Sequence, residues 1–109
     1  MSWDVDLTIE TGPNQWHVVE DFNHTDNQFQ LIQDLFGEPY LWDCVDGMKA
    51  GVLAEILTAG LHKCETSEID LAEYDSPNGW GTGESCYKFL WELRNACKKH
   101  RYTIVRVYK

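Results

Sequence analysis

Apolar and polar residues alternate over residues 3–10, which is the period of a β-strand with two unlike faces. One face is apolar and carries Trp3, Val5, Leu7 and Ile9. The other is polar and mostly acidic, with Asp4, Asp6, Thr8 and Glu10. After a turn cluster at residues 11–14, a second strand is predicted with Trp16, Val18 and Phe22 on one face and His17, Val19 and Asp21 on the other. We therefore predict an antiparallel hairpin with one solvated face.

After this hairpin, the apolar residues recur at the spacing of a helix. Residues 25–28 match a capping box, with Thr25 as N-cap and Gln28 reaching back from the third helical position. This helix is expected to end at Gly37. Residues 40–42 then form an apolar connector. Further elements are predicted as a helix over 48–63, a short helix from Ser67 to Tyr74, a helix from Glu84 to His100 and a last strand from Tyr102 to Tyr108.

The resulting order, β-β-α-α-α-α-β, predicts one α+β domain over residues 1–109. We expect a small antiparallel three-stranded sheet with the helices packed on one face. If the last strand pairs antiparallel with the first, residues 23–27 and the glycine-rich loop 76–83 meet at one end of the sheet. If it pairs with the second strand instead, the two segments separate.

The chain has 109 residues, 43% of them hydrophobic, and a formal net charge of −9. This composition excludes a disordered chain, and the acidity argues against direct nucleic-acid or anionic-membrane binding. No apolar run is long enough for a membrane span, and the first residues do not resemble a secretory signal, so a cytoplasmic location is expected. Residues 1–87 hold 17 acids and two lysines, a balance of −15, whereas residues 88–109 have a balance of +6. Such asymmetry suggests an acidic surface that faces a cationic partner.

Cysteine spacing predicts neither a metal site nor a disulfide framework. Cys44, Cys64, Cys86 and Cys97 include no close pair, and no cofactor is expected. Cys86 and Cys97 fall on the apolar stripe of the last helix, where buried thiols behave as small hydrophobic side chains.

Two sets of residues are candidates for binding. The first is the acidic sheet face, Asp4, Asp6, Glu10 and Glu20, which would meet a basic protein surface. The second is a small-ligand site at the end of the sheet, made of Asn23, Thr25, Asn27, Asn78 and Trp80. Residues 79–83 precede a helix but are only a weak phosphate-loop signal, since no Gly-Lys-Ser/Thr follows. The four histidines lie in four different predicted elements and form no recognisable catalytic pair, so we expect a protein that is not an enzyme.

Three motifs follow one another along the chain: the Trp-Asp-Val start at residues 3–5, the Asn-x-Thr-x-Asn stretch at 23–27, and Pro-Asn-Gly-Trp-Gly at 77–81. In this order they resemble a family of small uncharacterised bacteriophage and prophage proteins. The resemblance implies a phage-encoded accessory protein acting inside the bacterial host. By analogy with small acidic phage proteins, we expect it to bind a host protein with a basic surface and to inhibit a defence or nucleic-acid-handling system. Binding of a nucleotide-like ligand is the alternative.

Overall fold

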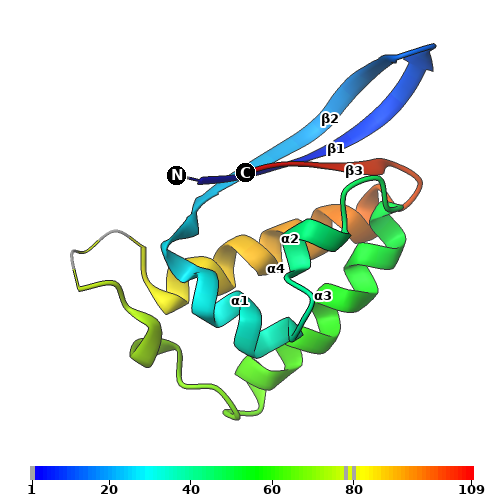
Figure 1. The fold of residues 1–109 in the computed structure, drawn as a ribbon. Helices are drawn as coiled ribbons and strands as arrows, with labels where there is room; N and C mark the ends of the chain where they lie inside the picture. The colour runs from blue at the N-terminus through cyan, green and yellow to red at the C-terminus, as the bar shows by residue number, and fades with distance from the viewer. Residues whose placement is uncertain (1, 78, 80) are drawn as a thin grey trace.

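The computed structural model describes residues 2–77, 79 and 81–109, with a sheet on one side of the helices (Figure 1). The strands are β1 (Ser2–Gly12), β2 (Gln15–Thr25) and β3 (Ile104–Tyr108). The α-helices are α1 (Phe29–Phe36), α2 (Leu41–Cys44), α3 (Ala50–Glu65) and α4 (Gly83–Lys99), with 3-10 turns η1 (Asp26–Gln28) and η2 (Leu71–Tyr74). The strand order is β2-β1-β3 and both pairings are antiparallel. The predicted α+β fold with a three-stranded antiparallel sheet is therefore confirmed.

The central strand β1 supplies the sheet's share of the core. Trp3, Val5 and Leu7 are at most 2% exposed, as their alternation predicted. The helices contribute buried leucines at helical spacing: Leu31 and Leu35 in α1, Leu53 and Leu57 in α3, and Leu90 and Leu93 in α4. Burying one such side chain contributes about 2 kcal/mol to folding. The apolar stripes of helices and strand thus close one core, and the other face of the sheet has no helix on it (Figure 1).

Strand β2 does not keep the regular alternation that we predicted. Its register with β1 shifts by one residue at Val19, which has no partner in β1. A bulge of this kind reverses the faces of the residues on either side of it. Phe22 consequently lies on the side of the helices, whereas Trp16 and Val18 lie on the side away from them. The prediction that these three side chains share a face is wrong for this reason.

The predicted capping box at Thr25 is not formed. The 3-10 turn η1 follows this residue, α1 begins only at Phe29, and its N-cap residue Gln28 makes no side-chain cap. The Gln28 side chain is directed away from the helix and donates from Nε2 to the carbonyl oxygens of Tyr74, at 2.9 Å, and Gly81, at 3.3 Å. The Gln28 side chain thus bonds distant backbone carbonyls and does not cap its own helix.

The short helix predicted from Ser67 also begins later than expected. Ser67 lies after the end of α3 with a φ of 62°, and the short helix is reduced to η2, capped by the Asp70 side chain. A reciprocal capping box is instead present at the start of α4, between Thr82 and Ser85. Helix α4 therefore begins where side-chain caps satisfy its first amide groups.

The β1–β2 hairpin extends beyond the rest of the sheet. Strand β3 pairs only with residues 4–8 of β1, so the tip of the hairpin has no third strand beside it. Figure 1 shows this tip projecting past the helices. Ile9, which alternation assigns to the helix-facing side, is accordingly 50% exposed.

Candidate functional site

The face of the sheet without helices, which we call the open face, carries an acidic cluster at its centre. Asp6 pairs directly with Asp21 of β2, and Asp4 pairs with Asn23. Directly opposite residues share a face at a Cβ separation of about 5 Å. Asn23 Nδ2 donates to Asp4 Oδ1 at 2.7 Å. Burial, followed by the charges of Asp21 and Asp4, raises the pKa of Asp6 above its ordinary value.

Aromatic and apolar side chains flank this cluster on the open face. The exposed ones are Trp16 (44%), Val18 (39%) and Tyr108 (48%). The Arg106 guanidinium lies over the Trp16 ring, 5.1 Å from its centroid. Since Arg106 is the β3 partner of Asp6, this contact independently assigns Trp16 to the open face. Glu10 pairs with Trp16 and adds a carboxylate at this end. Exposed tryptophan and tyrosine rings are enriched at protein-contact surfaces.

Glu20 does not belong to the acidic face on which we predicted it. It pairs with Leu7, a core residue, and therefore lies on the side of the helices. There its Oε2 lies 2.9 Å from His100 Nε2 at the end of α4. The open face brings together Asp4, Asp6 and Glu10 of the predicted set, and Asp21 takes the place that we gave to Glu20.

The two polar segments that the sequence singled out do meet at one end of the sheet. This follows from β3 pairing with β1, the first of the two topologies considered. Gln28 hydrogen-bonds the Gly81 carbonyl, and a Cβ atom at Gly81 would lie only 2.6 Å from Thr25 Cγ2. Gly81 has a φ of +85°, so both its conformation and its close approach to Thr25 favour glycine.

Only part of the predicted ligand-binding set lines a cavity at this junction. A polar cleft of about 430 Å³ is lined by Asn27 and Gln28 together with residues 73–77. Asn23 is directed to Asp4 on the open face, and Thr25 packs against Gly81. Asn78 and Trp80 lie outside the described residues. Gln28, which we had assigned only to a helix cap, is the residue that connects the two segments.

A Ser–His pair that the sequence did not reveal lies beside this junction. His24 Nε2 is 3.3 Å from Ser85 Oγ, and His24 Nδ1 is 2.8 Å from the Thr25 carbonyl oxygen, to which it donates. The His24 ring packs against Trp3 and Phe89, with centroids 5.8 and 5.2 Å away. No local signal identifies the pair, because its members are 61 residues apart in the chain.

The Ser85 hydroxyl is engaged in the helix cap. Its oxygen accepts from the Thr82 amide at 3.0 Å and its hydroxyl donates to the Thr82 carbonyl at 2.9 Å. The Thr82 carbonyl and His24 Nε2 compete for this one proton, because a neutral ring that donates from Nδ1 accepts at Nε2. This geometry supports a structural role for the pair, in which His24 fastens β2 to the start of α4.

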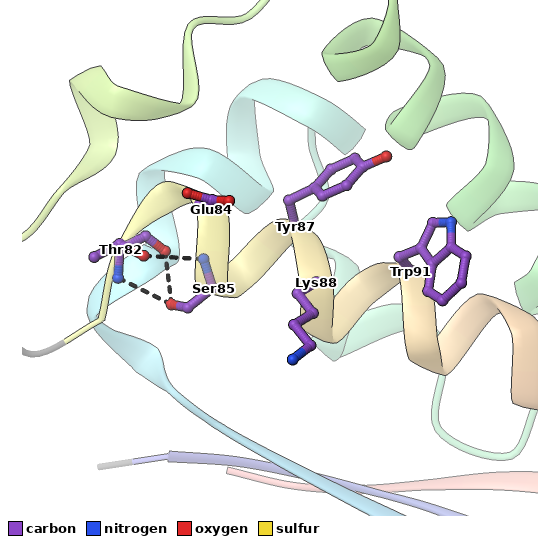
Figure 2. Close-up of a pocket in the computed structure, with 6 residues that line it drawn as sticks. All are labelled: Thr82, Glu84, Ser85, Tyr87, Lys88 and Trp91. Atoms are coloured by element: carbon purple, nitrogen blue, oxygen red, sulfur yellow. Dashed lines mark hydrogen bonds between the residues drawn. The ribbon is translucent and has the colours of Figure 1, made fainter.

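A second cavity of about 460 Å³ lies along the exposed side of α4 (Figure 2). Figure 2 shows Ser85 and Lys88 on the side of the helix nearer the strands, with Trp91 one turn further on. The amide groups at the start of α4 already have protein acceptors: Gly83 donates to Asp75 Oδ1 and Ser85 to Thr82 Oγ1. These bonds do not support a phosphate loop at this helix terminus.

All four cysteines are free thiols: Cys44 is exposed, Cys64 is half-buried, and Cys86 and Cys97 are buried. Cys86 and Cys97 are fully buried, as predicted, and burial raises the pKa of each to about 12. These two thiols are therefore protonated at neutral pH. Within the part of the chain that the structure describes, no three histidine, cysteine or acidic side chains are grouped to hold a metal ion.

Comparisons with family models, with curated proteins and with solved structures find no match for this chain. Among the described residues, no helix has both the length and the apolar character needed to cross a membrane.

Proposed function

We propose that this protein binds a cationic protein through the open face of its sheet. The observation that carries the proposal is the cluster of Asp4, Asp6 and Asp21 on a sheet face that no helix covers. Like charges directly opposite each other on neighbouring strands destabilise a sheet. Basic side chains of a partner would relieve this repulsion, which the fold alone does not.

The rest of the open face is consistent with a protein partner. Trp16 and Tyr108 are half exposed beside the carboxylates, and tryptophan and tyrosine are enriched among the residues that dominate protein–protein binding. Basic side chains of the partner would pair with the carboxylates, and the acidic charge of the chain would accelerate the encounter.

The resemblance to phage proteins suggests where the partner comes from. The partner would be a protein of the bacterial host whose basic surface ordinarily contacts nucleic acid, since closely spaced carboxylates can take the place of phosphates. The expected outcome of binding is inhibition of that protein, and no reaction is assigned to this chain.

The proposal is tested by comparing proteins captured from a bacterial lysate on three immobilised versions of the chain. The open-face variant is Asp6→Asn/Asp21→Asn. The matched control, Glu55→Gln/Glu68→Gln, removes the same charge from exposed residues of α3 and the segment after it. A protein captured by wild type and control but not by the open-face variant supports the proposal. Equal capture by all three versions, or capture by none, overturns it.

A second candidate function is the binding of a small cationic ligand in the cleft of about 430 Å³ at the segment junction. Glu73, Asp75 and the Gln28 amide line this cleft, so the acceptors there favour amines and guanidinium groups. A thermal-shift experiment with arginine and putrescine tests it. A ligand at a hundred times its Kd stabilises the folded state by about 2.7 kcal/mol. No shift with either compound contradicts this candidate.

A further inference from the structure

The two outer edges of the sheet differ. The edge of β3 is covered by residues 46–49: Val105 exchanges backbone hydrogen bonds with this segment, and Val107 donates to Asp46 Oδ1. The outer edge of β2 makes no such backbone hydrogen bonds among the described residues, and its last residue, Thr25, packs against another segment, at Gly81. Residues 15–25 also contain neither lysine nor proline, the residues that commonly block a strand edge. One edge is thus closed by the fold and the other is available for pairing.

A groove runs beside this free edge, between β2 and α4. It has a volume of about 360 Å³ and is lined by Glu20 and Phe22 of β2 and by Trp91, Ala96 and Lys99 of α4, among others. Trp91 is 43% exposed and also lines the cavity of Figure 2, so the two hollows adjoin along the helix. An edge strand with an adjoining, partly apolar groove is the arrangement that binds an extended peptide by strand addition.

We propose that residues 20–25 of β2 accept an extended segment of the partner as a fourth strand of the sheet. This inference rests on the proposed function and specifies how the partner is held. The bulge at Val19 limits regular pairing to the stretch beside α4. Alternate side chains of an added strand point to opposite faces. Those on the helix side enter the groove between Phe22 and Trp91 and are apolar, while those on the open face lie next to Asp21 and are basic.

Charge favours such a partner over a second copy of this chain. A second copy of the chain has the same net charge of −9, so pairing two copies at this edge would bring two acidic chains together. Basic side chains in the added strand instead neutralise the carboxylates of the open face.

The experiment uses a capped peptide of about seven alternating lysine and valine residues, which is long enough to span residues 20–25. Its control has the same side chains and charge but methylated backbone nitrogens, so it cannot donate to a strand edge. Binding to the isotope-labelled full chain is followed by NMR. The unmethylated peptide is expected to shift the amide signals of residues 20–25 and slow their hydrogen exchange, and the control is not.

A variant in the groove adds a second test. Trp91→Ala is expected to weaken peptide binding about tenfold, because the ring is a wall of the groove. Tyr102→Ala, at an 85% exposed tyrosine outside it, is the matched control and should bind as wild type does. Equal binding by both variants contradicts the placement of the peptide.

Failure of this inference is distinguishable from failure of the proposed function. Equal binding of both peptides, lost in the Asp6→Asn/Asp21→Asn variant, overturns strand addition and leaves the acidic surface in place. If the unmethylated peptide protects the amides of residues 20–25 equally well in wild type and in Asp6→Asn/Asp21→Asn, strand addition is supported and the role of the carboxylates is contradicted. Absence of binding, or protection of residues 20–25 through self-association of the chain alone, overturns the inference.

Discussion

Asp6 and Asp21 lie directly opposite each other on neighbouring strands, on the face of the sheet that has no helix. Arg106 is the β3 partner of Asp6, but its guanidinium lies over the Trp16 ring and makes no ion pair within 4 Å with either carboxylate. The fold therefore keeps two carboxylates together without an ion pair to this arginine. Binding residues often reduce the stability of the free protein in this way.

Asp6→Asn is therefore expected to raise the free energy of unfolding at neutral pH, by about 0.5 kcal/mol. The pKa of Asp6 is raised in the folded state, so its ionised form opposes folding above that pKa. The gain from the variant should shrink as the pH falls through the raised pKa and disappear below 3.8, the ordinary value, where the carboxyl is protonated in folded and unfolded chains. Urea unfolding across this range measures it, with Glu55→Gln as control. A variant less stable than wild type at neutral pH would contradict the placement of Asp6.

Gly83→Ala should destabilise the protein through a close contact between α4 and η2. A Cβ atom at this position would lie 1.9 Å from the Leu71 carbonyl oxygen, so the backbone of one element must move. Overpacking of this kind costs about 2 kcal/mol. Thermal unfolding measures the loss, and Glu84→Ala, at an exposed neighbour, should have a much smaller effect. Wild-type stability in Gly83→Ala would show that the two elements are not in contact.

Ser85→Ala should lower the free energy of unfolding by about 1 kcal/mol, because it removes half of the capping box of α4. It also removes the partner of His24 Nε2. Ser85→Thr keeps the hydroxyl and is expected to recover most of the stability. Urea unfolding of both variants distinguishes the hydroxyl from the side-chain volume, and equal losses in the two would reject the cap.

The hydrogen bond from the Tyr74 hydroxyl to Asp34 Oδ2, 2.5 Å long, should be visible in a tyrosine titration. It raises the pKa of Tyr74 to about 12 and lowers the pKa of Asp34. An ultraviolet pH titration should show one tyrosine ionising near this value, and Asp34→Asn should return it toward 10. Since the pKa of Asp34 is lowered, its contribution to stability is present above 3.8 and is lost as the pH falls further. An unchanged tyrosine titration in Asp34→Asn would contradict the contact.

Hydrophobic alternation was sufficient to predict the central strand. Trp3, Val5 and Leu7 point into the core with no interruption, so period and burial agree. The same reasoning failed in β2, because one extra residue at Val19 exchanges the faces of the residues on either side of it. The amino-acid composition of the strand does not indicate this bulge. The acidic cluster was therefore identified through Asp4 and Asp6, while Glu20 was assigned to the wrong face.

Long-range hydrogen bonds account for the other differences. Thr25 and Gln28 have the spacing of a capping box, but the Gln28 amide bonds carbonyls of two segments about 50 residues away. A sequence motif reports local preferences, and here a contact between distant loops prevails over them. The same limit hides the approach of His24 to Ser85.

The affinity of the recovered partner for three versions of this chain tests the central claim most directly. Titration calorimetry with wild type, Asp6→Asn/Asp21→Asn and Glu55→Gln/Glu68→Gln compares the open face with an equal change of charge elsewhere. Loss of two carboxylates that pair with basic side chains should weaken binding at least about tenfold, and the control should bind as wild type does. Equal affinity of the open-face variant and the wild type would contradict binding through the open face.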